Sequence, residues 1–242
     1  MPRNVELDHD ETMTPHVRSI TLVRHGRTAY NAQHRLQGQI DIPLDEVGMW
    51  QVRQTASALR ELYVDRHPEA ACQLVVCSDL KRAAATAHAF ADPLGLDVHP
   101  DVRVRERSFG DWEASPSKSS PNGSPRIICH GPVPRRRAQV WRRTEAERRQ
   151  AWCRGVERLG VEGRLRYRPV RVLAWRLDLA DVADAAGIER SAWRFRDILS
   201  MRNAHWVRLA PLELQGALRW RLVDYNHGPA IADTEQWEHP QL

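Results

Sequence analysis

Hydrophobic and polar positions in the first hundred residues predict alternating strands and helices. An apolar run from Ser19 to Val23 predicts a strand over about 18–24. Asp45 can cap the helix that follows, over about 46–65. The apolar face of that helix is made of Val47, Trp50, Val52, Ala56, Leu59 and Leu62.

The same order repeats further along. A second apolar run predicts a strand over about 73–77, and the next helix covers about 79–91 because Pro93 cannot continue it. A short strand is expected near 97–99. Since strands that alternate with helices form βαβ units, the first half indicates an α/β protein with parallel strands.

Two segments near the C-terminus alternate as antiparallel strands do, namely Ala204–Leu209 and Trp220–Tyr225. Residues 1–17 read as a polar, disordered lead, and residues 227–242 as a loose tail. One domain over 18–226 is the expectation for a chain of 242 residues.

Composition narrows the class of protein. No long apolar run is present, so neither a signal peptide nor a membrane span is expected. The four cysteines show no CxxC or metal-ligand spacing, which favours a reduced, cytoplasmic setting. The acidic and histidine residues of the first half form no tight ligand cluster, so we expect no metal and no cofactor.

Arg24-His25-Gly26 follows the first strand directly. Open α/β sheets bind ligands at the C-terminal edge of their strands. A neutral imidazole can attack phosphorus and carry the phosphoryl group as a covalent intermediate. The guanidinium of Arg24 suits phosphate and, by charge repulsion, favours the unprotonated form of His25, while Gly26 permits close approach of the backbone. The triplet alone is common by chance, so an ordinary polar loop is the alternative.

Three further motifs follow in order. They are Arg35-Leu36-Gln37-Gly38-Gln39-Ile40-Asp41, then Cys77-Ser78-Asp79-Leu80-Lys81-Arg82, and Arg105-Glu106-Arg107-Ser108-Phe109-Gly110-Asp111-Trp112-Glu113. Together with the triplet they resemble the histidine phosphatase superfamily, in its phosphoglycerate mutase-like branch. The resemblance is strong over about 18–114 and weaker over 203–226, where Asn203–Trp206 and Tyr225-Asn226 resemble the closing strands. It implies a three-layer α/β/α sandwich with a mostly parallel central sheet.

The resemblance also implies roles for individual residues. His25 would be the phosphorylated nucleophile, Arg24 and Arg82 would hold the phosphate, and Glu106 would be the general acid toward the leaving oxygen. Arg24 and Arg82 would also contact the substrate, with Asn31, Gln37 and Gly38 lining its pocket. The alternatives are a solvated helix arginine at 82 and a surface carboxylate at 106 paired with Arg105 or Arg107. Arg27 stands where many relatives have Glu, an added positive charge that suits phosphate.

The middle of the chain departs from this pattern. Residues 114–176 hold 16 Lys and Arg against 4 Glu, a net charge of +12, whereas the whole chain carries +5. Such a block is typical of a solvated, disordered or polyanion-binding segment. Parallel strands are buried on both faces, yet only Arg166–Trp175 approaches an apolar run here, and arginines interrupt it. Residues 115–176 are therefore read as disordered or disrupted.

The resemblance implies a second His-Gly in this region, and no candidate fits well. His130 follows an apolar run but lies too soon after Glu106, His205 belongs to a closing strand, and His227 lies in the tail. A frameshift is one hypothesis, because codons permitted for Leu173–Arg176, moved by one base, can read Ser-His-Gly. That reading would place the histidine near 174–175. The gene sequence tests it, since no indel relative to close relatives would remove the idea.

Three classes of function follow. The first is a phosphomonoester hydrolase that acts on small phosphorylated metabolites through phosphohistidine, or a mutase-like phosphoryl transferase. The second is a phosphate-binding relative whose chemistry is weakened because the second histidine is missing. The third is a nucleic-acid binder that uses Arg135–Arg137 with Trp141, Arg142 and Arg143, and it is disfavoured because no nucleic-acid motif accompanies these residues. Neither substrate identity nor oligomeric state can be read from the sequence.

Overall fold

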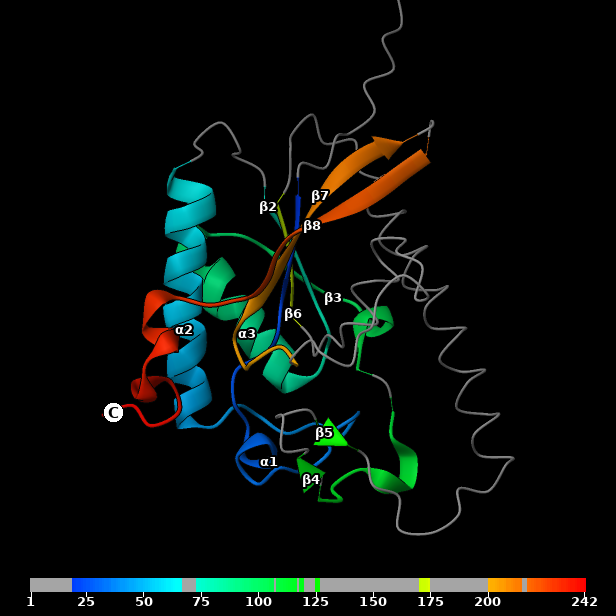
Figure 1. The fold of residues 1–242 in the computed structure, drawn as a ribbon, viewed down its shortest axis with the longest axis vertical. Coiled ribbons are helices and arrows are strands. Elements are labelled where there is room, and N and C mark those ends of the chain that lie inside the picture. The colour runs from blue at the N-terminus through cyan, green and yellow to red at the C-terminus, as the bar shows by residue number, and fades with distance from the viewer. Residues whose placement is uncertain are drawn as a thin grey trace, which may run out of the picture.

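The computed structural model describes residues 19–66, 73–106, 108–116, 118–119, 125–126, 170–174, 200–214 and 217–242. Its centre is a six-stranded sheet in the order β3-β2-β6-β1-β7-β8 (Figure 1). The strands are β1 (Ser19–Val23), β2 (Gln73–Cys77), β3 (Val98–Pro100), β6 (Val170–Ala174), β7 (Trp206–Leu214) and β8 (Ala217–His227). The α/β class predicted from the sequence is confirmed.

The sheet is mixed. Strands β3, β2, β6 and β1 are parallel to one another. Strand β7 pairs with β1 in the antiparallel direction, and β8 pairs with β7 in the same way. The two alternating segments near the C-terminus are thus the antiparallel pair that the sequence predicts. All four parallel strands end at the same edge, so the loop that carries His25 lies at their C-terminal ends.

Strand β6 corrects the expectation that residues 115–176 offer no strand to the central sheet. Val170–Ala174 lies between β1 and β2, with Ala174 in register with Val23 on one side and Cys77 on the other. The segment contains Arg171, which breaks the apolar run that a doubly buried strand normally shows. Its backbone nevertheless completes the hydrogen bonding of both neighbours.

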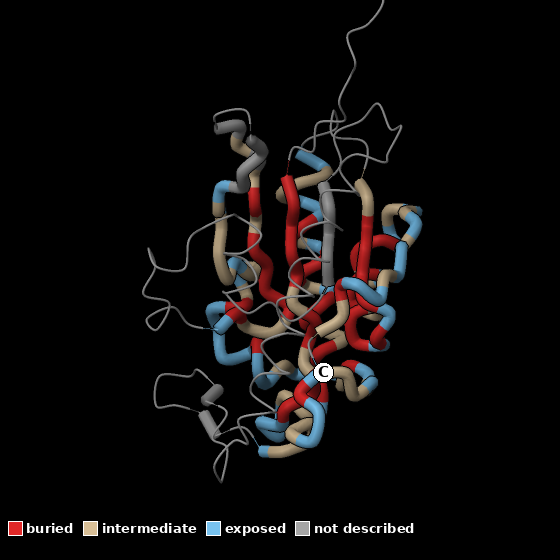
Figure 2. Tube along the Cα trace, turned by 90° about the vertical axis from the view of Figure 1, so that its right-hand side faces the viewer, coloured by how far each residue is buried: buried red, intermediate tan, exposed pale blue. Residues whose placement is uncertain are grey.

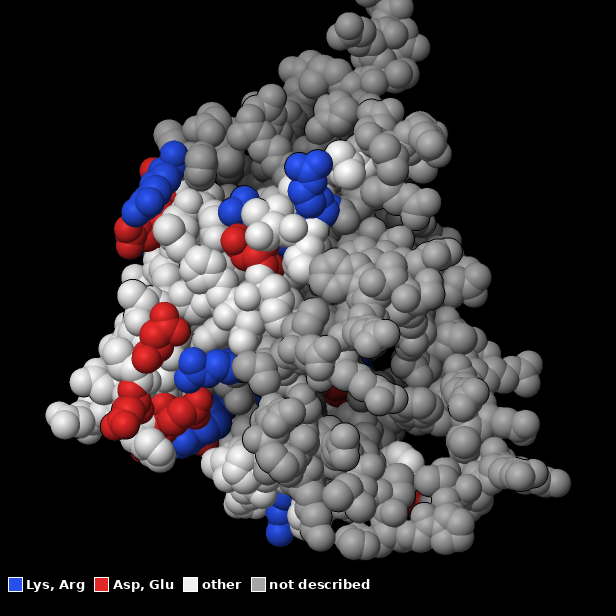
Figure 3. Space-filling model, viewed as in Figure 1, with Lys and Arg blue, Asp and Glu red and all other residues white. Residues whose placement is uncertain are grey.

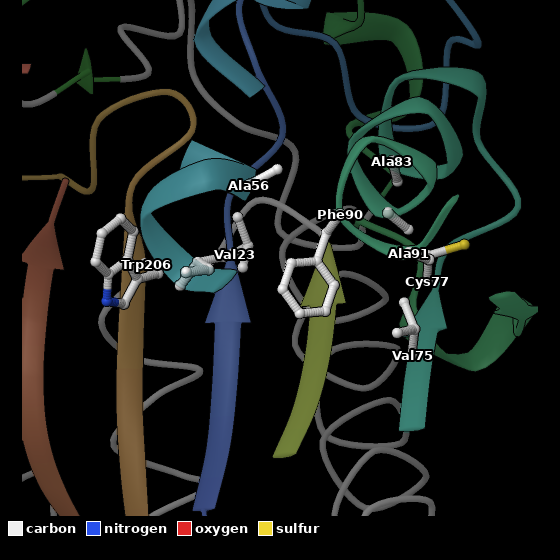
Figure 4. Close-up of a cluster of buried hydrophobic side chains, with 10 residues drawn as sticks. Val23, Ala56, Val75, Cys77, Ala83, Phe90, Ala91 and Trp206 are labelled. Carbon is white, nitrogen blue, oxygen red and sulfur yellow. The ribbon is translucent and has the colours of Figure 1, made fainter. Parts of the chain in front are cut away.

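Two helices, α2 (Glu46–Arg60) and α3 (Lys81–Ala91), pack against each other and against one face of the sheet. Asp45 caps α2 as predicted, accepting a hydrogen bond from the Gly48 N–H, and a π-helical turn, Glu61–Asp65, extends the helix. Figure 4 shows Phe90 of α3 pointing toward the sheet, between Val23 and Val75. Buried apolar area at this interface is what holds the helices in place.

The opposite face of the sheet is buried as well. Leu22, Val76 and Val207 alternate with the residues that face the helices, and each is at most 1% exposed. In Figure 2 the strands whose burial is described show long buried stretches through the middle of the molecule. The predicted second helical layer would lie on this face, outside the described residues.

The C-terminal segment corrects the expectation of a loose tail. Residues 229–242 contain two short 3-10 turns, Ala230–Asp233 and Glu235–Trp237, and Trp237 is fully buried. Gln51 of α2 donates its side-chain N–H to the Trp237 carbonyl at 2.9 Å. Trp50 packs on the Trp237 ring at a centroid distance of 5.5 Å. A single buried tryptophan thus anchors a segment that has no helical or strand periodicity to reveal it.

Smaller elements complete the described chain. They are α1 (Ala29–Ala32), the 3-10 turns Asp92–Leu94, Val102–Val104 and Gly110–Trp112, and the antiparallel pair β4 (Lys118–Ser119) and β5 (Pro125–Arg126). The predicted lead, residues 1–17, and most of 115–176 lie outside the described residues.

Gly48 offers a test of how closely α2 approaches the loop after His25. A Cβ at this position would lie 1.9 Å from the Arg27 carbonyl oxygen. Replacing glycine by alanine in a helix usually stabilises by about 1 kcal/mol. Here the clash reverses the sign, and we expect Gly48→Ala to destabilise by about 1–3 kcal/mol in urea unfolding.

Ser57→Ala is the matched control, since Ser57 is an exposed position of the same helix. That variant should be neutral or slightly stabilising. A Gly48→Ala protein more stable than the wild type would contradict this close approach of the two backbones.

Candidate active site

His25 lies two residues beyond the end of β1 and is only 2% exposed. Its Nδ1 lies 2.7 Å from the Gly26 carbonyl oxygen. A carbonyl can only accept, so Nδ1 carries the proton in this contact and the lone pair is on Nε2. The local backbone therefore selects the tautomer in which Nε2 is the nucleophilic nitrogen.

Arg82 lies in the first turn of α3 and is 2% exposed, which excludes the solvated helix arginine considered above. Its guanidinium donates to the Gly38 carbonyl at 2.7 Å and to the Ile40 carbonyl at 2.8 Å. One helical turn on, Thr86 donates its hydroxyl to the Arg82 carbonyl and accepts a bond of 3.4 Å from the Gly26 N–H. The start of α3 thus adjoins the loop that follows His25.

Gln37, Gly38 and Asn31 belong to the same network. The Thr28 hydroxyl contacts Gln37 Oε1 at 3.0 Å and Asn31 Oδ1 at 3.1 Å. Gln37 is 3% exposed, and its buried Nε2 has no hydrogen-bond partner among the described contacts. Gly38 adopts a φ of +54°, and a side chain there would collide with the carboxylate of Glu113. Only glycine fits at position 38, because Glu113 occupies the space that a side chain there would need.

Glu106 is half-buried and joins the network through its backbone. Gln39 donates its side-chain N–H to the Glu106 carbonyl at 3.1 Å. The neighbouring Arg105 pairs with Asp79, and this contact lowers the pKa of the Asp79 carboxyl against the opposing effect of burial. Glu113, which the sequence did not single out, accepts from the Gln39 N–H and the Phe109 N–H, both at 3.0 Å.

Arg24 contacts a segment from the far end of the chain. Its guanidinium donates to the Met201 carbonyl, and its N–H donates to the His205 carbonyl at 2.9 Å. Asn203 reaches the backbone of His25 and Gly26 from this segment. The sequence indicated Asn203–Trp206 only as part of a closing strand. A contact between the Asn203 side chain and a loop far away in the sequence leaves no periodic pattern that could predict it.

Two charged residues act locally. Arg27 was expected to add positive charge for phosphate, but its Nε pairs with Asp45 at 2.9 Å and its Nη1 donates to the Glu238 carbonyl at 3.1 Å. Asp41 accepts from the Lys81 N–H at 2.7 Å and so caps α3. Arg27 therefore ties the C-terminal segment to α2, and Asp41 places the helix that carries Arg82.

Of the three candidates for the second histidine, the structure describes His205 and His227. His130 lies outside the described residues. His227 is the last residue of β8, not part of a tail, and stacks on Trp206 at 4.8 Å. His205 is 2% exposed and packs edge-on against Trp237. Its Nδ1 contacts the Asn203 carbonyl at 3.0 Å.

Burial lowers the pKa of His205 to about 4, and nearby Arg202 and Arg24 contribute in the same direction. An unfolded histidine titrates near 6.5. Between pH 6.5 and 4 the unfolded chain therefore binds a proton that the folded chain refuses, so stability falls as pH drops through this window. We expect this one residue to remove roughly 3 kcal/mol of unfolding free energy by pH 4.

Urea unfolding at several pH values between 7 and 4 measures this loss, with His205→Gln as comparison. Glutamine keeps an N–H donor and does not titrate. Its stability profile should be flatter than that of the wild type across the window. Parallel profiles would show that His205 does not stay neutral in the fold.

Among the described residues, no group of three or more His, Cys, Asp or Glu is arranged to hold a metal ion. The helices in that part of the chain are all too short or too polar to cross a bilayer. The described contacts link Arg82 and Glu106 to the loop at Gly38–Ile40, and Thr86 of α3 to the loop after His25, so the candidate residues belong to one set of neighbouring loops.

Comparison with known proteins identifies the family of the chain. The family profile of the Histidine phosphatase superfamily (branch 1) matches residues 20–149, more than half of the chain. The chain therefore belongs to the histidine phosphatase superfamily.

Individual relatives refine the picture. The chain is 43% identical over 97 residues to a glucosyl-3-phosphoglycerate phosphatase of Mycolicibacterium vanbaalenii, which is 40% of each chain. It is 41% identical over 94 residues to a probable phosphoglycerate mutase GpmB of an Enterobacter species, 39% of this chain and 40% of that one. The similarity thus spans about two fifths of the curated relatives.

Solved structures extend the likeness to most of the fold. A mycobacterial glucosyl-3-phosphoglycerate phosphatase in complex with VO3 is 26% identical, with a TM-score of 0.64 over 87% of this chain and 99% of that one. A structure described as Mycobacterial hydrolase 1 is also 26% identical, with a TM-score of 0.60 over 88% of this chain and all of that chain.

Proposed function

We propose that this chain hydrolyses phosphomonoesters of small metabolites through a phosphoryl group carried on Nε2 of His25. The observation that carries the proposal is the contact between His25 Nδ1 and the Gly26 carbonyl, because it directs the lone pair to the other nitrogen. Arg24 and Arg82 supply positive charge for the transferring oxygens. Glu106 protonates the leaving oxygen, and Asn31, Gln37 and Gly38 border the substrate.

The finer architecture belongs to the same proposal. We place a second helical layer on the buried face of Leu22, Val76 and Val207, which would make a three-layer sandwich around the parallel half of the sheet. The protein would act in the cytoplasm on a soluble substrate.

We expect activity to be weaker than in relatives that carry a second His-Gly, because the sequence offers no well-placed candidate for it. Losing one preorganised donor costs on the order of 10²–10³ in rate. The register of β6 is relevant to the frameshift hypothesis. Ala174, the last residue of β6, pairs with Val23, the residue that precedes Arg24. The histidine read in the other frame, near 174–175, belongs at that strand end.

Product analysis tests the proposal and separates its alternatives. Glucosyl-3-phosphoglycerate is the first substrate to try, given the names of the relatives. Release of inorganic phosphate without isomerisation would support a hydrolase, and isomerised product would indicate a mutase. Thermal protection by phosphate with turnover at background would instead indicate a binding relative.

Nucleic-acid binding finds no support on the face drawn in Figure 3. The Arg135–Arg137 cluster lies outside the described residues. On the face drawn in Figure 3, the acidic and basic side chains of the described part lie close to one another rather than forming a patch of one sign. Binding to DNA or RNA that weakens steeply with salt would be needed to revive that alternative.

A further inference from the structure

We infer that Asn203 is a positioning residue for His25, an inference that rests on the proposed function. The Asn203 side chain donates its Nδ2 hydrogens to the His25 carbonyl at 3.1 Å, the Gly26 carbonyl at 3.2 Å and Asn31 Oδ1 at 3.1 Å. All three partners are oxygens, and Asn31 Oδ1 also accepts from the Thr28 N–H. The amide of Asn203 must therefore present its nitrogen to them, with at least one of its two hydrogens shared between two acceptors.

The Gly26 carbonyl oxygen connects Asn203 to the His25 ring. The same oxygen accepts from His25 Nδ1, so one atom joins the imidazole to the Asn203 amide. Asn203 also holds the His25 carbonyl, and two consecutive peptide groups are thereby pinned. Fixing these groups fixes both the tautomer and the direction of the ring, which is how a residue can act through a nucleophile without touching substrate.

The segment that carries Asn203 is braced for this task. Ala204 has a φ of +55° and is fully buried, a conformation that costs energy for any residue other than glycine. It lets the Ala204 N–H donate to the His25 carbonyl at 3.1 Å. Thr55 of α2 also donates its hydroxyl to the Ala204 carbonyl at 2.6 Å, a hydrogen bond that involves neither the Asn203 amide nor the loop of His25.

A further brace comes from the C-terminal segment. The Arg202 N–H donates to Asn226 Oδ1 at 2.7 Å, and its guanidinium donates to the Ala232 carbonyl at 2.7 Å. Asn203 also links two motifs that lie close in sequence, the loop of His25 and the start of α1 at Asn31. Its removal should therefore loosen the nucleophile and one border of the substrate pocket together.

Two variants of the full chain test the inference. Asn203→Ala removes the amide, and Asn203→Asp keeps its shape while replacing the donor by a carboxylate oxygen. Ring ¹⁵N NMR of His25 in the free protein should show protonated Nδ1 in the wild type and a mixture of tautomers in both variants. With p-nitrophenyl phosphate as probe, we expect kcat to fall by about 10²-fold and the pH profile of kcat to shift.

Thr55→Val is the matched control, because it removes a buried hydrogen bond from the same turn without touching His25 or Gly26. It should lower thermal stability and leave the ¹⁵N signals of His25 as in the wild type. Unchanged His25 signals in both Asn203 variants, or the same change in Thr55→Val, would overturn the inference. A wild type without phosphatase activity, whose His25 signals still depend on Asn203, would refute the proposed function while supporting the positioning role.

Discussion

Replacing His25 by alanine should lower turnover of p-nitrophenyl phosphate by at least about 10³-fold, because the variant lacks the proposed nucleophile. The imidazole is 2% exposed, and its Nδ1 is committed to the Gly26 carbonyl. Incubation with a ³²P-labelled phosphomonoester, followed by rapid denaturation under alkaline conditions, should trap label in the wild type and none in His25→Ala.

His88→Ala is the matched control, since His88 is an exposed histidine on α3 that pairs with Asp92. It should retain both label and turnover. A His25→Ala protein that is folded by circular dichroism and still releases phosphate at the wild-type rate would end the proposal. Label that persists in that variant would assign the covalent intermediate to another residue.

Replacing Arg82 by alanine should harm both activity and stability. The guanidinium would be lost from the phosphate site, at a cost on the order of 10²–10³ in kcat/KM. The Gly38 and Ile40 carbonyls would also lose their charged donor, and unsatisfied buried groups cost about 1–3 kcal/mol each. Steady-state kinetics and urea unfolding on the same preparation measure the two losses.

Arg82→Lys separates the contributions, because lysine keeps the charge but lacks the planar fork that reaches two carbonyls. We expect it to recover part of the activity and little of the stability. Arg60→Ala removes a half-exposed arginine paired with Asp65 and should change neither measurement appreciably. Full activity in Arg82→Ala would show that this arginine only supports the loop at Gly38–Ile40.

Local sequence patterns predicted much of the fold. The apolar run at Ser19–Val23, the capped helix after Asp45 and the strand at 73–77 all lie where expected, because each carries its own periodicity or cap. Strand β6 lies within Arg166–Trp175, the nearest approach to an apolar run in the middle region, but it was not assigned to the sheet because arginines interrupt it and its partners are distant in sequence. The packed C-terminal segment escaped notice because it is held by the buried Trp237 and by arginines from distant parts of the chain, which leave no periodic pattern.

The candidate site was readable for a related reason. His25, Arg82 and Glu106 each stand in a short motif whose neighbours constrain the backbone. Asn203 and Glu113 also stand in motifs that the sequence offered, but their roles did not show there, since their contacts run to loops that only the folded chain brings near. For Arg27 the sequence suggested a role in phosphate binding, whereas in the fold its guanidinium pairs with Asp45.

The position of β6 between β1 and β2 also affects folding during synthesis on the ribosome. Strands β1 and β2 emerge early, but the strand that belongs between them is 147 residues behind Val23. At elongation speeds of about 5–20 residues per second that gap is on the order of ten seconds. During this gap β1, and also β2 once it has emerged, present unpaired edges, which are templates for aggregation. Yield in a living cell should therefore depend on chaperones that bind nascent chains, whatever the final stability.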